Sequence, residues 1–212
     1  MKTLVLITAF NVEKFLEDVV MRIPKEIKSY NPEILIINDF SSDKTLQKMK
    51  EIKDNFKDFK ITCLTNKTNL GYGGNQKVGY YYAIKNNFDY VVMLHGDGQY
   101  APENIIDMIK PLAENKCSAV QGSRMIKKMN ALKGKMPYYK FFGNIFLTYV
   151  QNLLSGLKMS EYHSGYRAYS VKALKKIPFN LNSNYFHFDT QILLQLKVVN
   201  EKIFEIPIPT FY

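Results

Sequence analysis

The sequence runs Val91-Val92-Met93-Leu94-His95-Gly96-Asp97-Gly98-Gln99-Tyr100-Ala101-Pro102 where an apolar segment ends abruptly in polar side chains. A short apolar run bounded by turn residues predicts a buried strand. His95, Asp97 and Gln99 occupy alternate positions after it, so they point the same way if the strand direction persists. An imidazole, a carboxylate and an amide oxygen that converge can hold a divalent ion. The alternative is a polar turn, in which Gly96 and Gly98 supply unusual backbone angles.

Apolar segments of strand length alternate with helix-like segments along the rest of the chain. Strands are predicted at residues 4–7, 34–37, 61–64, 90–94 and 119–122. Helices are predicted at residues 12–27, 42–56, 75–86 and 102–114. This alternation predicts an α/β fold, a doubly wound and mostly parallel sheet with helices on both faces. A further helix is expected to start at 186–191, and the proline-containing segment 202–209 predicts an edge strand.

The composition is that of one globular domain. The chain has 212 residues, of which 46% are hydrophobic and 23% charged, and no linker divides it. The net charge of +10, from 29 basic against 19 acidic residues, favours anionic partners, although a lysine-rich surface would give the same balance. Cys63 and Cys117 lie far apart and predict buried free thiols in a reducing compartment.

No signal peptide or membrane-spanning helix is expected, because the chain enters a strand at once and has no run of about 18 apolar residues. The sequence therefore predicts a cytoplasmic protein, either free or attached peripherally to the cytoplasmic membrane face.

Four predicted strand ends carry polar or glycine-rich signatures, and such ends meet along one crevice of a doubly wound sheet. They are Thr8-Ala9-Phe10-Asn11-Val12-Glu13, Asn38-Asp39-Phe40-Ser41-Ser42-Asp43-Lys44-Thr45, Asn69-Leu70-Gly71-Tyr72-Gly73 and His95-Gly96-Asp97-Gly98-Gln99. Their order resembles the family 2 glycosyltransferases, whose motifs are Pro-Ala-Tyr-Asn-Glu-Glu, Asp-Asp-Gly-Ser-x-Asp-x-Thr, Asn-x-Gly-x-Gly and Asp-x-Asp-x-Gln. The likeness covers nearly the whole chain. It is greatest to the branch of dolichyl-phosphate mannose synthase and the bacterial polyprenyl-phosphate sugar transferases.

The resemblance implies the Rossmann-like GT-A fold and a nucleotide-sugar donor, UDP- or GDP-linked. The residues that it places at the donor are Ala9, Asn11, Glu13, Asp39, Gly71, Gly73 and Asp97. A carboxylate such as Asp39 suits the N–H and O–H groups of a base or ribose. Asp43 and Thr45 are more consistent with the start of a helix. Glycines before a helix admit a phosphate, or simply form a tight turn.

The resemblance also implies a divalent metal, Mn²⁺ or Mg²⁺, held by Asp97 and Gln99, with His95 as a further candidate. His95 replaces the family's aspartate, which favours softer ions such as Mn²⁺ if it is a ligand. The alternative places His95 beside the ion, in contact with phosphate.

Acceptor residues are expected in the second half of the chain. Glu161-Tyr162-His163-Ser164-Gly165-Tyr166-Arg167 resembles the family's Asp-x-x-Ser-Gly-Phe-Arg, and Ser123 and Arg124 follow a predicted strand. Ser123, Arg124 and Arg167 are candidates for holding phosphate, which guanidinium matches in a bidentate fashion. Catalysis is assigned to Asp97, Glu161 and Arg167. Glu161 is a candidate base for a hydroxyl acceptor; for an anionic phosphate acceptor it would instead orient Arg167 or His163.

A basic and aromatic segment lies between these motifs. Its lysines are Lys127, Lys128, Lys133, Lys135 and Lys140, and an aromatic-rich helix follows at about residues 141–154. Such a segment suits an anionic membrane surface, or is a core helix after a loop. No RNA-binding motif accompanies it, so no nucleic-acid partner is predicted.

The sequence thus predicts an inverting, metal-dependent glycosyltransferase acting on a polyprenyl phosphate. Residues 1–122 would form the nucleotide-sugar half and 123–212 the acceptor half of one domain. The alternatives are transfer to a saccharide hydroxyl and a non-catalytic nucleotide-sugar or membrane-binding module. Many relatives continue past the position of Tyr212, so this is a minimal catalytic domain or lacks a C-terminal part.

Overall fold

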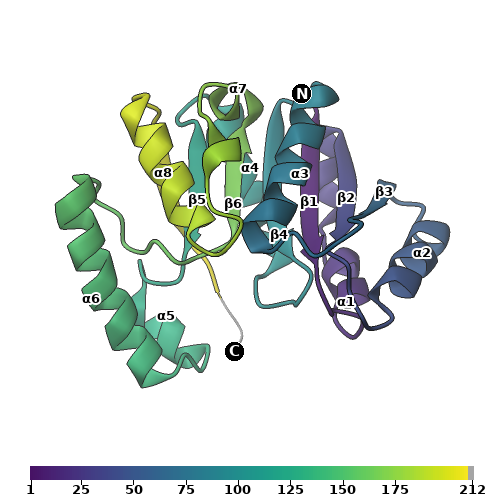
Figure 1. Cartoon of the computed structure of the whole chain (residues 1–212), viewed down its shortest axis with the longest axis horizontal. Coiled ribbons are helices and arrows are strands. Elements are labelled where there is room, and N and C mark those ends of the chain that lie inside the picture. The colour runs from purple at the N-terminus through teal and green to yellow at the C-terminus, as the bar shows by residue number, and fades with distance from the viewer. Residues whose placement is uncertain (210–212) are drawn as a thin grey trace.

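A mixed seven-stranded sheet forms the centre of the molecule (Figure 1). The computed structural model describes residues 1–209, apart from the side chains of Met129, Asn130 and Lys133. The strand order is β3-β2-β1-β4-β6-β5-β7, and β6 alone is antiparallel to its two neighbours in this described sheet. The strands are β1 (Thr3–Ala9), β2 (Pro32–Asn38), β3 (Lys60–Thr65), β4 (Tyr90–His95), β5 (Ala119–Ser123), β6 (Arg167–Ser170) and β7 (Ile203–Pro207).

The strands supply apolar side chains to two cores, one on each face of the sheet. In β1, Val5 and Ile7 belong to one cluster and Leu4 and Leu6 to the other. Because successive strand residues point to opposite faces, such a run requires helices on both sides. The first core receives residues of α1 (Leu16–Met21), α2 (Thr45–Asn55) and α4 (Ile105–Ala113). The second receives residues of α3 (Tyr72–Lys85), α7 (Val171–Leu174) and α8 (Phe188–Val198). The predicted two-sided α/β sheet is confirmed.

The helix predicted over residues 12–27 is shorter in the structure. α1 ends at Met21, and the 3₁₀ helix η1 (Lys25–Tyr30) follows Pro24. Pro24 has no amide proton and disfavours helical backbone at the residue before it, so the helix does not continue. Two further 3₁₀ turns are η2 (Pro102–Asn104) and η3 (Phe179–Leu181).

The sequence analysis missed β6, which lies between β4 and β5. Arg167 of β6 is in register with both Met93 and Gln121. The strand has four residues and begins with a charged one, so no apolar run marks it. β7 lies at the sheet edge beside β5, as its prolines predicted.

α5 (Lys128–Lys133) and α6 (Tyr138–Ser155) stand away from the sheet, at the left of Figure 1. The buried residues of α6 are Phe141, Asn144 and Thr148. Over residues 1–209, no helix is both long and apolar enough to cross a membrane. Cys63 and Cys117 are free thiols, as predicted; Cys117 is buried, whereas Cys63 is only half-buried.

Candidate active site

Three parallel strands end side by side at one edge of the sheet. Ala9 of β1 is in register with Asn38 of β2, and Thr8 of β1 with His95 of β4. The side chains at and after these positions surround a cavity of about 410 Å³, here called the strand-edge cavity. Its lining includes Thr8, Ala9, Asp39, Asn69, Gly71, Tyr72, Asn75, His95, Asp97, Tyr185 and Phe186. The predicted crevice residues Ala9, Asp39, Gly71 and Asp97 therefore come together.

Asp39 is held rigidly at the wall of this cavity. It is 3% exposed, and its Oδ1 accepts hydrogen bonds from the Asn66 side chain and the Leu70 amide, both at 2.8 Å. The carboxylate thus joins the end of β2 to the loop before α3. Such anchoring fixes the direction of the carboxylate at the cavity wall.

Asn11 and Glu13 serve the neighbouring loop and do not line the strand-edge cavity. Asn11 Oδ1 accepts from the Ser42 amide at 2.9 Å, and Glu13 Oε2 accepts from the Lys44 amide at 2.7 Å. Asp43 accepts hydrogen bonds from the amides of Glu13 and Thr45. The three side chains therefore join the β1 loop to the start of α2, so Asp43 has the structural role that its helix-start position predicted.

The glycines before and in α3 allow a close approach of protein backbone. A Cβ on Gly71 would lie 2.7 Å from the carbonyl oxygen of Asn184, and one on Gly73 would lie 2.6 Å from that of Ser183. The amides of Gly73 and Gly74 both donate to the Asn184 carbonyl, at 2.7 and 3.2 Å. These helix-start donors are engaged by the protein, which favours the tight-turn alternative for Gly73 and Gly74.

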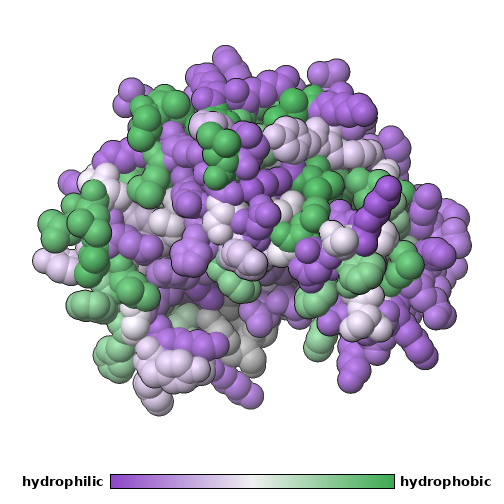
Figure 2. Space-filling view, in the orientation of Figure 1, coloured by the Kyte–Doolittle hydropathy of each residue, from purple (hydrophilic) through white to green (hydrophobic). Residues whose placement is uncertain are grey.

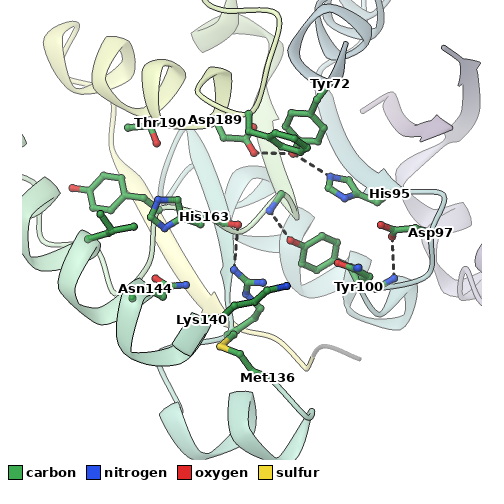
Figure 3. Close-up of a pocket in the computed structure, with 17 residues that line it drawn as sticks. Tyr72, His95, Asp97, Tyr100, Met136, Lys140, Asn144, His163, Asp189 and Thr190 are labelled. Carbon is green, nitrogen blue, oxygen red and sulfur yellow. Dashed lines mark hydrogen bonds between the residues drawn. The ribbon is translucent and has the colours of Figure 1, made fainter. Parts of the chain in front are cut away.

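His95 lies half-buried at the end of β4, in contact with two tyrosines. Its Nε2 is 3.1 Å from the Tyr72 hydroxyl, and its ring meets that of Tyr100 edge-on at 5.0 Å. Tyr72 donates to Asp189 Oδ2 at 2.7 Å, so three side chains form a hydrogen-bonded row (Figure 3). Burial lowers the pKa of His95, and the nearby charge of Asp97 partly opposes this. The imidazole is therefore neutral at neutral pH.

A second cavity, of about 620 Å³, opens beside α6 and is here called the α6 cavity (Figure 3). It shares Tyr72, His95, Asp97 and Phe186 with the strand-edge cavity. Its other lining residues include Gln99, Tyr100, Arg124, Met136, Lys140, Asn144, Leu147, Tyr162, His163, Gly165, Asp189 and Thr190. The two cavities thus meet at His95 and Asp97.

Glu161 and Arg124 form a buried ion pair at the α6 cavity. Glu161 is fully buried; its Oε2 accepts from the Arg124 amide at 2.9 Å and its Oε1 from Arg124 Nε at 2.8 Å. Asn144 Nδ2 also donates to Oε1, at 2.8 Å. Arg124 is 8% exposed and lines the cavity, whereas Glu161 lies behind it. Glu161 therefore orients Arg124, instead of the Arg167 or His163 that the sequence suggested.

Arg167 and Ser123 lie away from both cavities, in the protein interior. Arg167 is fully buried and donates to the carbonyl oxygens of Ser164, Tyr162 and Asp189 at 2.6–2.8 Å. Ser123 is 1% exposed, and its hydroxyl is 2.6 Å from that of Ser160. In the structure Arg167 thus joins the loop at residues 162–164 to the start of α8, where the sequence predicted contact with phosphate.

The sequence of residues 4–178 matches the model of the family described as glycosyl transferase family 2. The chain belongs to this family. A relative from Methanococcus voltae, a UDP-N-acetylglucosamine–dolichyl-phosphate N-acetylglucosaminyltransferase, is 31% identical across 98% of this chain and 84% of its own length. The undecaprenyl-phosphate mannosyltransferase of Micrococcus luteus is 23% identical across 83% of this chain and 70% of its own.

The fold of this glycosyltransferase is GT-A, as a solved structure confirms. A mannosyltransferase from Pyrobaculum calidifontis, in complex with GDP-Man and Mn²⁺, superposes with a TM-score of 0.63 at 14% identity. The match covers 97% of this chain and 54% of the other, so the chain spans about half the length of that protein.

The junction of the two cavities in this family 2 enzyme carries side chains of the kinds that bind divalent ions. The half-buried Asp97 carboxylate and the neutral His95 imidazole both line the junction, and Gln99 lines the α6 cavity. Among the described residues, no group of three or more His, Cys, Asp and Glu side chains is placed so that it could hold a metal ion by itself. The protein therefore supplies few ligands for a metal ion at this junction. An ion bound there would need further oxygen ligands, such as those of a bound phosphate.

The structure adds site residues to those predicted from the sequence. Tyr72 lies inside the glycine motif, Asn144 on α6, and Asp189 at the start of α8, in the segment 186–191 where the sequence predicted a helix start. Tyr72 and Asp189 are 117 positions apart. No local pattern relates positions so distant.

Proposed function

We propose that this glycosyltransferase moves a sugar from a nucleoside diphosphate to the phosphate of a polyprenyl phosphate, with inversion at the anomeric carbon. The nucleotide would occupy the strand-edge cavity and the acceptor phosphate the α6 cavity. The observation that carries the proposal is that both cavities meet at Asp97. Donor and acceptor bound there would reach one another beside a single carboxylate.

The donor assignment is supported by the lining of the strand-edge cavity. Asp39 offers a fixed hydrogen-bond acceptor for base or ribose groups. Ala9 has a small side chain and Gly71 has none, so the cavity keeps room for a base or ribose ring. The M. voltae relative is named for a UDP-sugar, whereas the P. calidifontis structure holds GDP-Man.

We propose that a divalent ion, Mn²⁺ or Mg²⁺, is held by Asp97, His95 and the donor diphosphate, with Gln99 close by. When bound, such an ion neutralises the charge that develops on the departing nucleoside diphosphate. The protein contributes the carboxylate of Asp97 and the half-buried setting, which strengthens the attraction between opposite charges.

The acceptor assignment rests on the state of the carboxylates. Glu161 is fully buried and already accepts hydrogen bonds from Arg124 and Asn144, so it is poorly placed to take a proton from a hydroxyl. Asp189 likewise accepts from Tyr72 and Gln76. A phosphate acceptor is already anionic and needs no base, and Arg124 presents a guanidinium at the cavity wall. The names of the M. voltae and M. luteus relatives both contain a polyprenyl phosphate acceptor.

We further propose that α6 lies on an anionic membrane surface. Tyr139, Phe142, Phe146, Tyr149 and Leu153 follow a spacing of three or four residues, so they form one stripe along the helix, and each is at least 65% exposed. Hydrophobic side chains gather over this part of the molecule, at the left of Figure 2. Lys127, Lys128, Lys135 and Lys140 are exposed at its N-terminal end. Leu147 of α6 also lines the α6 cavity, which connects the stripe to the acceptor site.

A donor panel tests the proposed reaction. UDP-N-acetylglucosamine, UDP-glucose and GDP-mannose are offered with Mn²⁺, and nucleoside diphosphate release is followed with and without a short polyprenyl phosphate. We expect one donor to be consumed when the lipid phosphate is present. Consumption with a saccharide alcohol, and none with lipid phosphate, would favour the hydroxyl acceptor. Calorimetric binding of nucleotide without turnover of any donor would favour a non-catalytic module.

A further inference from the structure

The Tyr72 hydroxyl stands between a carboxylate and an imidazole. Its oxygen is 2.7 Å from Asp189 Oδ2 and 3.1 Å from His95 Nε2. A phenol has one proton to donate, whereas an ionised carboxylate only accepts. Asp189 also accepts from Gln76 Nε2 at 3.3 Å and lies 3.9 Å from Arg167 Nε, so the side chains around it offer donors. The Tyr72 proton therefore points to Asp189.

The direction of this bond determines the proton position on His95. With its proton committed to Asp189, the Tyr72 oxygen can only accept from the ring, so Nε2 carries the imidazole proton. Nδ1 then keeps its lone pair. The described residues make no hydrogen bond to Nδ1, and His95 borders both cavities.

We propose that Tyr72 is a positioning residue, which with Asp189 keeps His95 in the Nε2–H form and so presents the Nδ1 lone pair to a divalent ion beside Asp97. The metal part of this inference rests on the proposed function; the tautomer part does not. A neutral imidazole nitrogen is a softer ligand than a carboxylate oxygen, so it favours Mn²⁺ over Mg²⁺. Hydrogen bonding of the other ring nitrogen is the usual means by which a protein orients a ligand histidine.

Two further contacts keep the row in place. The Tyr72 ring stacks on Phe186, with centroids 4.8 Å apart and planes at 29°. A Cβ on Gly165 would lie 2.5 Å from His95 Cε1 and Nε2 and 2.6 Å from the Tyr72 oxygen. The backbone at Gly165 thus covers the Nε2 edge of the ring, and Nδ1 is the nitrogen left for a ligand.

The tautomer is tested by long-range ¹H–¹⁵N spectra of the metal-free protein at about pH 8, where an ordinary imidazole is neutral. His95→Gln identifies the His95 signals, with His163 and His187 as internal references. We expect a protonated Nε2 and a bare Nδ1. A protonated Nδ1 in the wild-type protein would overturn the proposal, whether or not the protein transfers sugar.

Two variants separate this arrangement from the ordinary preference of an imidazole. In Asp189→Asn the side-chain amide can donate to the Tyr72 oxygen, so the Tyr72 proton can point to His95 Nε2 instead. We therefore expect the population of the Nδ1–H tautomer of His95 to increase. In Tyr72→Phe we expect exchange of the Nε2 proton with water to become roughly tenfold faster, because one hydrogen bond is lost. The control is Tyr81→Phe, an exposed position on the same helix. Unchanged His95 spectra in both Asp189→Asn and Tyr72→Phe would contradict the assignment.

Metal binding gives a second readout. Tyr72→Phe keeps the ring that stacks on Phe186, so the fold should survive, which the spectra themselves check. We expect Mn²⁺, titrated with nucleoside diphosphate present and followed by electron paramagnetic resonance, to bind roughly 10–100-fold more weakly, and Mg²⁺ to be affected less. Equal weakening for both ions would remove His95 from the ligands and leave the tautomer result standing.

Discussion

Glu161 holds Arg124 at the wall of the α6 cavity through both of its carboxylate oxygens. One oxygen accepts the arginine backbone amide and the other its Nε, so both the chain and the side chain of Arg124 are fixed. Glu161 is itself fully buried. The pair thus places the Arg124 guanidinium at the cavity wall, with its counter-charge buried behind it.

The first prediction concerns this pair. Glu161→Gln removes the negative charge beside the buried Arg124 guanidinium, and we expect a loss of about 3–5 kcal/mol of unfolding free energy. The double variant Glu161→Met with Arg124→Met should recover most of that stability, because both charges are gone, yet remain inactive on lipid phosphate. Urea unfolding and acceptor kinetics measure the two effects. Full activity of the double variant would exclude Arg124 from the acceptor site.

The second prediction is metal dependence through Asp97. Asp97→Asn keeps the shape of the side chain and removes its charge at the junction of the cavities. We expect transfer to fall by roughly 10²–10³-fold, as for other losses of transition-state charge stabilisation. Asp107→Asn, an exposed change on α4, is the matched control. Undiminished transfer in chelator, or in Asp97→Asn, would exclude this role.

The third prediction concerns donor binding at Asp39. Asp39→Asn should weaken nucleoside diphosphate binding by about 1.5–3 kcal/mol, the range for hydrogen bonds to a charged group. Calorimetry measures this directly, with the exposed Asp54→Asn as control. Since Asp39 also accepts from the Leu70 amide, part of the loss would come from a looser loop before α3. An unchanged affinity would place the nucleotide elsewhere.

The fourth prediction is a pH effect on stability. Burial lowers the pKa of His95, so the unfolded chain takes up the proton first as pH falls. In the unfolded chain the pKa of histidine is about 6.5. The stability contributed by neutral His95 is complete above this unfolded-state pKa and is lost as pH falls through it. In chelator, the wild-type protein should lose more unfolding free energy between about pH 7.5 and about pH 5.5 than His95→Gln does. Equal losses would show that the imidazole is not held neutral.

The fifth prediction is salt-sensitive attachment to anionic vesicles. Each basic residue near such a surface contributes about 1 kcal/mol, and salt screens it. Co-sedimentation should therefore be strong at low salt and weak at high salt. The test variant places glutamate at Lys127, Lys128, Lys135 and Lys140, and the charge-matched control places it at the exposed Lys44, Lys50, Lys53 and Lys57 around α2.

We expect the variant near α6 to leave the vesicles and to lose more activity on lipid than on soluble acceptors. Phe142→Ser with Phe146→Ser should act in the same direction, because both side chains are exposed and their loss spares the core. A wild-type protein that ignores anionic vesicles at low salt would refute the membrane surface and favour a saccharide acceptor. The side chain of Lys133, part of the same predicted basic segment, lies outside the described residues.

Local sequence determined the strands and the polar segments at their carboxyl ends. Apolar runs such as 91–94 are buried whatever the partner strand, and the carboxyl ends of parallel strands share one edge. The positions of Asp39 and Asp97 at the crevice were therefore predictable from the chain alone. The edge position of β7 was also predictable, because it follows from the prolines within that segment. The aromatic character of α6 was predictable too, because it follows from residues close together in the chain.

Tertiary structure decided which side chains face the cavities. Arg167 resembled a phosphate ligand in sequence, yet its strand inserts between β4 and β5, where the guanidinium is enclosed by carbonyl oxygens. Glu13 resembled a donor ligand, yet the packing of two loops gives it the Lys44 amide. The pairing of Arg124 with Glu161 and of Tyr72 with Asp189 joins residues far apart in the chain. Such contacts depend on how the whole sheet is packed, which hydrophobic periodicity and local propensity do not encode.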